Sequence, residues 1–238
     1  GCDMLHCTSN TAPISSNIPL IVTLHDIIYM EKSYLQILRD KGTNYQKFGN
    51  VYRKFIVPRV VKKARKIITV SKFEKNRIGD FFGFPESDNR LVAVYNGVSE
   101  HFRVVNDQEE LQRVKKKYHL PDEFIFFLGN TDPKKNTKGV LKAYSDFLKK
   151  FKRRIPLVML DYDRDALRDL LREIGDPEME NDIHLTGYVV NTDLPSIYAQ
   201  SELFLYPSLR ESFGIPMLEA MRCGTPGIRS DTSSMPEV

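Results

Sequence analysis

Short apolar runs alternate with longer amphipathic segments along nearly the whole chain, and this alternation limits the fold more than any other feature. Short apolar runs bounded by turn residues are typical of buried strands, whereas apolar residues at helical spacing indicate helices. Strands are expected at residues 18–24, 67–70, 91–94, 124–128, 157–160, 183–185 and 203–206. Strands separated by helices imply parallel sheets with helices on both faces, so the pattern predicts a doubly wound α/β fold.

Helical segments fill the intervals between these runs. Ser71 is well placed to cap the first of them, because its hydroxyl can accept from the unpaired amides of a helix start. Helices are expected at residues 72–82, 107–118, 138–151, 164–174 and 194–200, and from Pro216 onward. A longer amphipathic stretch covers 45–66, and Pro58 is expected to kink or divide it.

Composition and charge exclude several classes of protein. The 238 residues are 41% hydrophobic and 28% charged, so a packed core is expected and wholesale disorder is not. The net charge is only +4, and no aromatic platform is interleaved with the basic runs, so no nucleic-acid partner is expected. No apolar run approaches the ~20 residues of a membrane span, and no signal-peptide pattern opens the sequence.

The cysteines are few and odd in number: Cys2, Cys7 and Cys223. This usage fits a reducing compartment and predicts a cytoplasmic location. Cys2, His6 and Cys7 are close enough in sequence to suggest metal ligands, but no second ligand cluster follows, and no metal site is expected. A buried strand end is the preferred interpretation of the mostly apolar residues 4–7.

The strand–helix pattern restarts after a polar seam at residues 98–121, which predicts two lobes with a cleft between them. We place the boundary so that residues 1–110 form one domain and residues 111–238 the other. In such folds, ligands bind beyond the carboxyl ends of the strands. This rule directs attention to His25, Asn96-Gly97, the loop after Gly129, Gly187 and the segment after Tyr206.

The segment from Pro207 to Met221 is the most informative stretch for chemistry. Pro216 suits the first position of a helix, and Gly214 before it allows close backbone approach. Unpaired amides at such a helix start bind anions, typically phosphate. Glu211 could accept from sugar hydroxyls and Glu219, about one turn inside the helix, from both hydroxyls of a ribose. The alternative is an ordinary strand–turn–helix with surface acids.

Residues 211–221, together with Cys223-Gly224-Thr225-Pro226 and residues 233–238, resemble the Glu–seven residues–Glu segment of glycosyltransferase family 4, the retaining nucleotide-sugar enzymes of GT-B fold. Further segments resemble the family in the same order: His25-Asp26, residues 69–73, 94–98 and 127–136, and Gly187-Tyr188-Val189. The resemblance implies two Rossmann-like lobes, both incomplete, because the family's opening glycine-rich loop and closing helix would lie beyond the two ends.

The resemblance also implies roles for individual residues, with the donor bound mainly by residues from about 119 onward. His25 and Glu211 are the implied catalytic residues, near the transferred sugar and on its hydroxyls. The implied donor-binding residues are Gly129, Asn130, Lys134, Lys135, Tyr188, Val189, Ser212, Phe213, Gly214, Ile215 and Glu219. Asn130 stands where the family often has Arg, so Lys134 is expected to assist Lys135 on the diphosphate. For Lys134 and Lys135, the alternative is a solvated basic loop. For His25, the alternative is a strand-end histidine bonded to backbone.

The expected reaction is transfer of a sugar from a nucleoside diphosphate to a glycan or lipid-linked acceptor with retention at the anomeric carbon and without a metal or other cofactor. Asp161-Tyr162-Asp163 has the spacing of a metal-bridging motif but is expected to begin a helix instead. The run His25-Asp26 and the loop Pro133-Lys134-Lys135-Asn136 look most like those of mannosyltransferases of lipopolysaccharide or exopolysaccharide assembly. A nucleotide-sugar binding fragment without turnover, a sugar-nucleotide 2-epimerase and a scaffold with a vestigial cleft stay open.

Residues 52–66 mix basic side chains with Phe55, Ile56, Val57, Val60 and Val61. A basic amphipathic helix can lie on an anionic membrane surface, which would place the protein peripherally at the inner face of the membrane. An equal alternative is a helix packed on its own sheet with its basic face in water.

Overall fold

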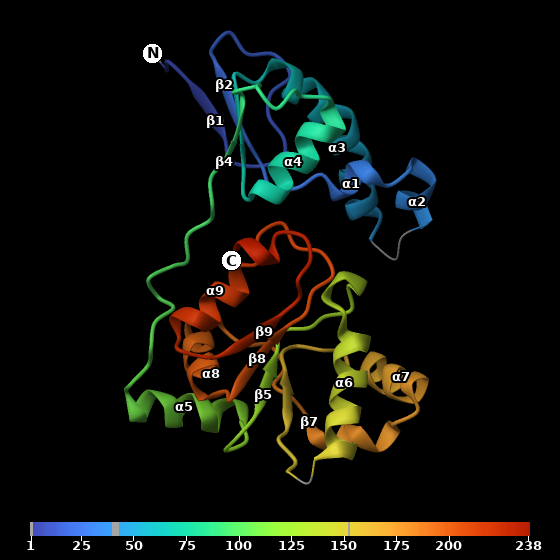
Figure 1. Ribbon diagram of the computed structural model, residues 1–238, viewed down its shortest axis with the longest axis vertical. Coiled ribbons are helices and arrows are strands. Elements are labelled where there is room, and N and C mark those ends of the chain that lie inside the picture. The colour runs from blue at the N-terminus through green and yellow to red at the C-terminus, as the bar shows by residue number, and fades with distance from the viewer. Residues whose placement is uncertain (1, 40–42, 152) are drawn as a thin grey trace. The chain divides into compact units, whose positions relative to one another are not determined.

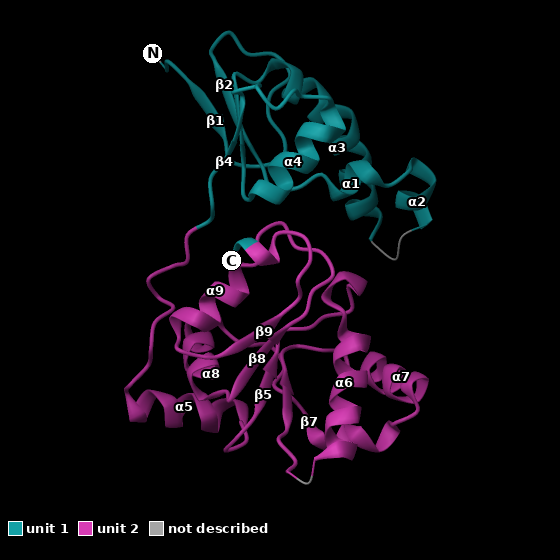
Figure 2. Ribbon diagram, viewed as in Figure 1, with its two compact units in different colours: residues 1–96, 237 teal, residues 97–236, 238 magenta. Residues whose placement is uncertain are grey.

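The computed structural model describes residues 2–39, 43–151 and 153–238, and the chain forms two compact units (Figure 1). Unit 1 comprises the residues up to Asn96 together with Glu237, and unit 2 comprises 97–236 and Val238 (Figure 2). The expected boundary lay at residues 110 and 111. The segment before it packs with unit 2, because the 3% exposed Phe102 ring meets the Tyr198 ring edge-on at 6.2 Å.

Unit 1 is a four-stranded parallel sheet in the order β1-β2-β3-β4. The strands are β1 (Leu5–Cys7), β2 (Leu20–Leu24), β3 (Lys66–Thr69) and β4 (Leu91–Ala93). The helices are α1 (Ile28–Glu31), α2 (Tyr34–Arg39), α3 (Asn44–Lys63) and α4 (Lys72–Phe82). Residues of β2 and β3 that point to one face, such as Val22 and Ile67, are fully buried and share a core with α3.

Helix α3 runs through Pro58 as one element, so the proline does not divide it. Its start is fixed by a reciprocal capping box, in which Thr43 accepts from the Gln46 amide and the Gln46 side chain accepts from the Thr43 amide. Val57, Val60 and Val61 on either side of the proline are at most 1% exposed. Burial of these side chains offsets the ~3 kcal/mol that a proline costs inside a helix.

Unit 2 is a five-stranded parallel sheet in the order β7-β6-β5-β8-β9. The strands are β5 (Ile125–Phe127), β6 (Leu157–Met159), β7 (Ile183–Leu185), β8 (Leu203–Tyr206) and β9 (Gly227–Arg229). The α-helices are α5 (Gln108–Tyr118), α6 (Thr137–Lys150), α7 (Arg164–Ile174), α8 (Leu194–Gln200) and α9 (Ile215–Arg222). The strand order runs outward in one direction from β5 to β7 and in the other from β8 to β9, so the sheet has its topological switch point between β5 and β8.

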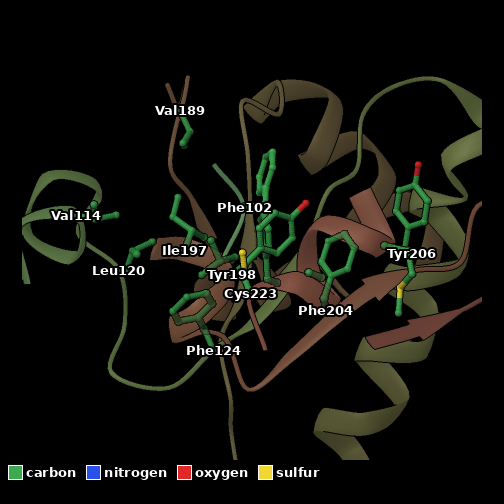
Figure 3. Close-up of a cluster of buried hydrophobic side chains, with 14 of the residues drawn as sticks. Phe102, Val114, Leu120, Phe124, Val189, Ile197, Tyr198, Phe204, Tyr206 and Cys223 are labelled. Atoms are coloured by element: carbon green, nitrogen blue, oxygen red, sulfur yellow. The ribbon is translucent and has the colours of Figure 1, made fainter. Parts of the chain in front are cut away.

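Alternate residues of the unit 2 strands enter two different cores, as a doubly wound sheet requires. Ile125 and Phe127 belong to one core, which includes residues of α6 and α7. Phe126 and Phe204 belong to the other, which Figure 3 shows in part, and each contacts the fully buried Tyr198 ring at centroid distances of 5.2 and 5.1 Å (Figure 3). The predicted doubly wound α/β fold is thereby confirmed.

The structure also contains short 3₁₀ helices: η1 (Pro133–Lys135), η2 (Pro177–Asp182), η3 (Asn191–Asp193) and η4 (Met235–Glu237). Within residues 2–39, 43–151 and 153–238, no helix combines the length and the apolar character needed to cross a bilayer.

Candidate functional site

The loops that follow β5 and β8 lie side by side in unit 2, because these strands are parallel neighbours and their carboxyl ends share one edge of the sheet. Two hydrogen bonds join the loops directly. The Leu209 amide donates to the Lys134 carbonyl at 2.7 Å, and the Asn136 side chain donates to the Pro207 carbonyl at 3.2 Å. Residues about 75 positions apart in sequence therefore build one site at the topological switch point, where α/β sheets bind ligands.

The loop after β5 is shaped by its own polar side chains. The Asn130 side-chain oxygen accepts from the Asp132 amide at 2.9 Å, and the Asp132 carboxylate accepts from the Lys134 amide at 3.0 Å, which caps η1. Asn136 then adopts the left-handed conformation (φ 58°) that starts α6. Asn130 thus has a structural task in the loop, and its amide does not supply the positive charge that an arginine would bring.

Lys135 is the cation at the centre of this site. Its ammonium lies 2.7 Å from Glu211 Oε1 and donates to the Tyr206 hydroxyl at 3.0 Å. The Lys135 and Glu211 side chains are only 14% and 13% exposed. Burial raises the pKa of Tyr206, and the neighbouring Glu211 charge raises it further, so the phenol stays protonated.

Glu211 is held in place through its backbone. Its amide donates to Ser233 Oγ at 3.0 Å, and the fully buried Ser234 hydroxyl donates to the Glu211 carbonyl at 2.9 Å and to the Phe213 carbonyl at 3.1 Å. Our sequence analysis assigned no role to Tyr206, Ser233 or Ser234. The sequence signal for the serines was their place in residues 233–238, which continue the family-like string after Pro226.

Helix α9 begins at Ile215, four residues after Glu211. Gly214 precedes it with φ 110°, a conformation that L side chains rarely adopt, and a Cβ there would lie 2.8 Å from the Met235 sulfur. No side chain caps this helix end. Phe213 is buried, Ser212 is half-buried and Ile215 is at the surface.

Glu219 lies one turn inside α9 and is partly buried. It accepts from the Tyr198 hydroxyl at 3.1 Å, a contact that sequence analysis did not anticipate. Burial raises the pKa of the Glu219 carboxyl above its ordinary value, although the hydrogen bond from Tyr198 and the charge of His101 oppose the rise. One of its oxygens is bound by Tyr198, which leaves acceptor capacity for hydroxyl groups of a ligand.

The remaining predicted donor-site residues differ in exposure and in the space around them. Lys134 is 40% exposed and lies 3.6 Å from its neighbour Asp132. Gly129 has no room for a side chain, because a Cβ would come within 2.2 Å of the Phe127 ring. Tyr188, after β7, is 73% exposed, whereas Val189 is 9% exposed and its side chain belongs to the core.

His25 lies in unit 1, directly after β2. Its ring is bonded to a backbone group: Nε2 is 3.0 Å from the Thr8 carbonyl, and the His25 amide donates to the Asn10 side chain at 2.8 Å. These contacts fix the ring orientation. They match the alternative of a strand-end histidine bonded to backbone and leave its exposed face available.

No group of three or more His, Cys, Asp or Glu side chains among the described residues is arranged to hold a metal ion. Asp163 caps α7 by accepting from the Ala166 amide at 2.7 Å, so the Asp161–Asp163 segment begins a helix as expected. Cys2, Cys7 and Cys223 are free thiols, and burial raises the pKa of Cys223 to about 11.

Comparison with known proteins identifies the family. Residues 107–238 match the family model described as glycosyl transferases group 1, and residues 1–102 match the model described as glycosyltransferase family 4. The O-antigen chain mannosyltransferase B of Escherichia coli is 36% identical over 179 residues, which cover 74% of this chain and 45% of that protein. The E. coli serotype-specific mannosyltransferase WbdA is 32% identical over 192 residues, which cover 79% of this chain and 23% of that protein.

Among solved structures, Anabaena HepE in complex with UDP and glucose aligns with a TM-score of 0.66 at 19% identity, over 92% of this chain and 55% of that one. The chain spans about half the length of HepE and less than half of the two curated relatives. The fold, the collinear segments and the family matches agree: the chain belongs to the group 1 family of glycosyl transferases and has their GT-B fold.

Proposed function

We propose that unit 2 binds a nucleoside-diphosphate sugar and that the protein transfers this sugar to a glycan or lipid-linked acceptor with retention of anomeric configuration. The observation that carries the proposal is the Lys135–Glu211 contact of 2.7 Å at the switch point, beside the start of α9. It brings together the three things that such a donor requires: a cation, hydroxyl acceptors and helix amides.

Different residues of the site contact the diphosphate, the ribose and the base of the donor. Lys135, with Lys134 at the rim, binds the diphosphate, and the amides of Phe213, Gly214 and Ile215 add fixed dipoles. Glu219 accepts from the ribose hydroxyls, which its half-buried carboxylate can do while Tyr198 holds one oxygen. The base lies against Tyr188 and the backbone of Val189.

The chemistry is departure of a diphosphate from the anomeric carbon through an oxocarbenium-like transition state. Negative charge develops on the leaving oxygen, so a pre-positioned ammonium and helix-end amides stabilise the transition state more than the ground state. Glu211 binds the sugar hydroxyls, a diphosphate oxygen takes the acceptor's proton, and His25 contacts the transferred sugar. These protein groups supply the positive charge, and the proposed reaction uses no metal.

Mannose is the proposed sugar, because both curated relatives named above are mannosyltransferases. The HepE complex contains UDP and glucose instead of mannose. The test therefore varies both the base and the sugar of the donor. We keep the cytoplasmic location expected from the sequence as part of the proposal.

The test is a thermal-shift panel of UDP-, GDP- and ADP-sugars on the purified protein, followed by a transfer assay with candidate glycan and lipid-linked acceptors. We expect stabilisation by one nucleotide class and, with acceptor, a product whose anomeric configuration by NMR matches the donor. Inversion would contradict the retaining reaction. Binding without turnover favours a binding module, a product from donor alone favours an epimerase, and no shift with any nucleotide favours a scaffold.

A further inference from the structure

A buried carboxylate in unit 2 joins helix α5 to the end of the loop that follows β7. Asp193, the last residue of η3, is 2% exposed. Its Oδ1 accepts from the Arg113 guanidinium at 2.7 Å, and its Oδ2 accepts from the Lys117 ammonium and the Tyr118 hydroxyl, both at 2.7 Å. Burial opposes ionisation, but these hydrogen bonds lower the pKa of Asp193 to about 2, so the carboxylate is charged at neutral pH.

The packing of α5 against α8 has an apolar basis of its own. Val114 of α5 and Ile197 of α8 are fully buried and belong to one core, in which Figure 3 also shows Val189 (Figure 3). A buried ion pair adds little net stability compared with apolar residues of the same volume, because the cost of desolvation offsets most of the attraction. Stability alone therefore does not account for Asp193, and the direction of its hydrogen bonds indicates a second role.

The Tyr118 hydroxyl connects Asp193 to the backbone of the loop. A carboxylate only accepts hydrogen bonds, so the hydroxyl must donate its proton to Asp193. The hydroxyl oxygen is then left as an acceptor, and the Val190 amide donates to it at 3.3 Å. We call this arrangement, from Asp193 through the Tyr118 hydroxyl to the Val190 amide, the Asp193–Tyr118 link.

Other backbone contacts hold the same loop before and after this amide. The His101 Nε2 lies 3.0 Å from the Asn191 carbonyl, which can only accept, so Nε2 carries the proton. The Asp161 amide donates to the Gly187 carbonyl at 3.0 Å, and Gly187 has φ 69°. The loop backbone is therefore fixed on both sides of the Tyr188 ring, which is 73% exposed.

We propose that the Asp193–Tyr118 link positions the loop of residues 187–191 for the base of the donor, which makes Asp193 and Tyr118 positioning residues for nucleotide binding. The inference rests on the proposed function, in which the base lies against Tyr188 and the backbone of Val189. It adds two side chains that are at most 7% exposed and that act through the loop backbone. A loop already held in its binding conformation does not have to be ordered when the base arrives, so more of the contact energy appears as affinity.

Tyr118→Phe breaks the link with a minimal change of volume. The variant loses both hydrogen bonds of the hydroxyl, while Asp193 keeps its contacts with Arg113 and Lys117. The loop should then leave its binding conformation for part of the time, and the apparent affinity falls with the populated fraction. We expect the affinity for a nucleoside diphosphate to fall by about threefold to tenfold, the equivalent of one hydrogen bond. The affinity for inorganic pyrophosphate, which has no base, should stay unchanged.

Tyr144→Phe is the matched control. Tyr144 is 3% exposed, and its hydroxyl lies 2.8 and 3.1 Å from the carbonyls of Ile155 and Asp182, beside the other core of unit 2. Isothermal titration calorimetry with UDP, GDP, ADP and pyrophosphate compares the wild type with both variants. The ratio of the nucleotide Kd to the pyrophosphate Kd should rise in Tyr118→Phe and in Asp193→Asn, but not in Tyr144→Phe.

Hydrogen exchange of the Val190 amide, followed by NMR, tests the link without a ligand. We expect faster exchange in Tyr118→Phe than in the wild type, and no change in Tyr144→Phe. Equal weakening of nucleotide and pyrophosphate binding, or unchanged exchange at Val190, would overturn the positioning role. A wild type that binds none of the three nucleotides would reject the proposed function, and with it the role of the loop in binding a base, whatever the exchange rates.

Discussion

The Lys135 ammonium and the Glu211 carboxylate are 2.7 Å apart although 76 positions separate them in the sequence. They meet because β5 and β8 are parallel neighbours, so the loops that follow them share one edge of the sheet. Both side chains are mostly shielded from water, and each is the principal charge partner of the other.

The first prediction concerns the energy of this pair. Lys135→Met leaves Glu211 as a shielded carboxylate without its cation, and breaking such a pair costs about 3–5 kcal/mol when it is buried and less here, where both groups keep some exposure. The double variant Lys135→Met/Glu211→Gln should recover much of this loss. Denaturant unfolding of the four members of the cycle gives the coupling, and additive effects would mean that the pair contributes nothing.

Glu211→Gln should abolish most of the transfer activity while the protein stays folded. The amide keeps the volume of the side chain but loses the charge that binds sugar hydroxyls, and we expect kcat to fall by about a hundredfold or more. Glu178→Gln, at an exposed position of unit 2, is the control. A Glu211→Gln protein with wild-type turnover would reject the proposed role.

Glu219 should make stability depend on pH. Burial raises its folded-state pKa above the ordinary value of 4.5, so the folded protein holds the proton more tightly than the unfolded chain. Its contribution to stability is therefore present below the unfolded-state pKa and is lost as pH rises through the folded-state pKa. Glu219→Gln should flatten this fall between acidic and neutral pH in melting curves, whereas Glu178→Gln should not.

Asp193 should make the folded protein less stable as pH falls, which is opposite to the effect of Glu219 and occurs at lower pH. Burial alone would raise its pKa, but hydrogen bonds from Lys117, Arg113 and Tyr118 outweigh burial and lower the pKa to about 2. Its stabilisation is present above the ordinary pKa of 3.8 and is lost as pH falls toward 2. Asp193→Asn should cost about 1–2 kcal/mol at neutral pH, because the two cations are half exposed, and the cost should vanish in acid.

Gly214→Ala tests the backbone at the start of α9. The alanine must adopt φ 110° and its Cβ meets the Met235 sulfur at 2.8 Å, so we expect a loss of about 1–3 kcal/mol and weaker nucleotide-sugar binding. Gly175→Ala is the matched control, because it has φ 79° with no neighbour within 4 Å. Equal effects of both changes on donor binding would contradict a specific role for Gly214.

The regular elements were predictable because local signals agree with the tertiary environment. The strand at 157–159 is a short apolar run in which all three residues are buried. Helices such as 72–82 and 164–174 carry a Ser or Asp cap and a left-handed glycine at the end. Each of the predicted strands forms within two residues of its expected bounds. Helix α1 was missed because it is four residues long with no side-chain cap, and β9 because its three residues are largely exposed.

The candidate site was only partly predictable. Glu211, Gly214 and Glu219 lie in one continuous segment, so sequence spacing was enough to group them. The contacts that hold them, from Tyr206 and Ser234 for example, depend on which strands become neighbours, and no local pattern encodes that order. Val189 shows the converse, because its place in the family-like segment did not reveal that its side chain turns into the core.

The pairing of Lys135 with Glu211 has a consequence for anion binding at this site. The Lys135 ammonium already has the Glu211 carboxylate as its partner, so under the proposed function the diphosphate of a donor would compete with that carboxylate for the cation. The affinity for the diphosphate then depends on the difference in free energy between its contact with Lys135 and the Lys135–Glu211 contact. The same step would free the Glu211 carboxylate for the sugar hydroxyls. Donor binding in the proposed function is therefore an exchange of ligands on Lys135, in which the diphosphate replaces the Glu211 carboxylate.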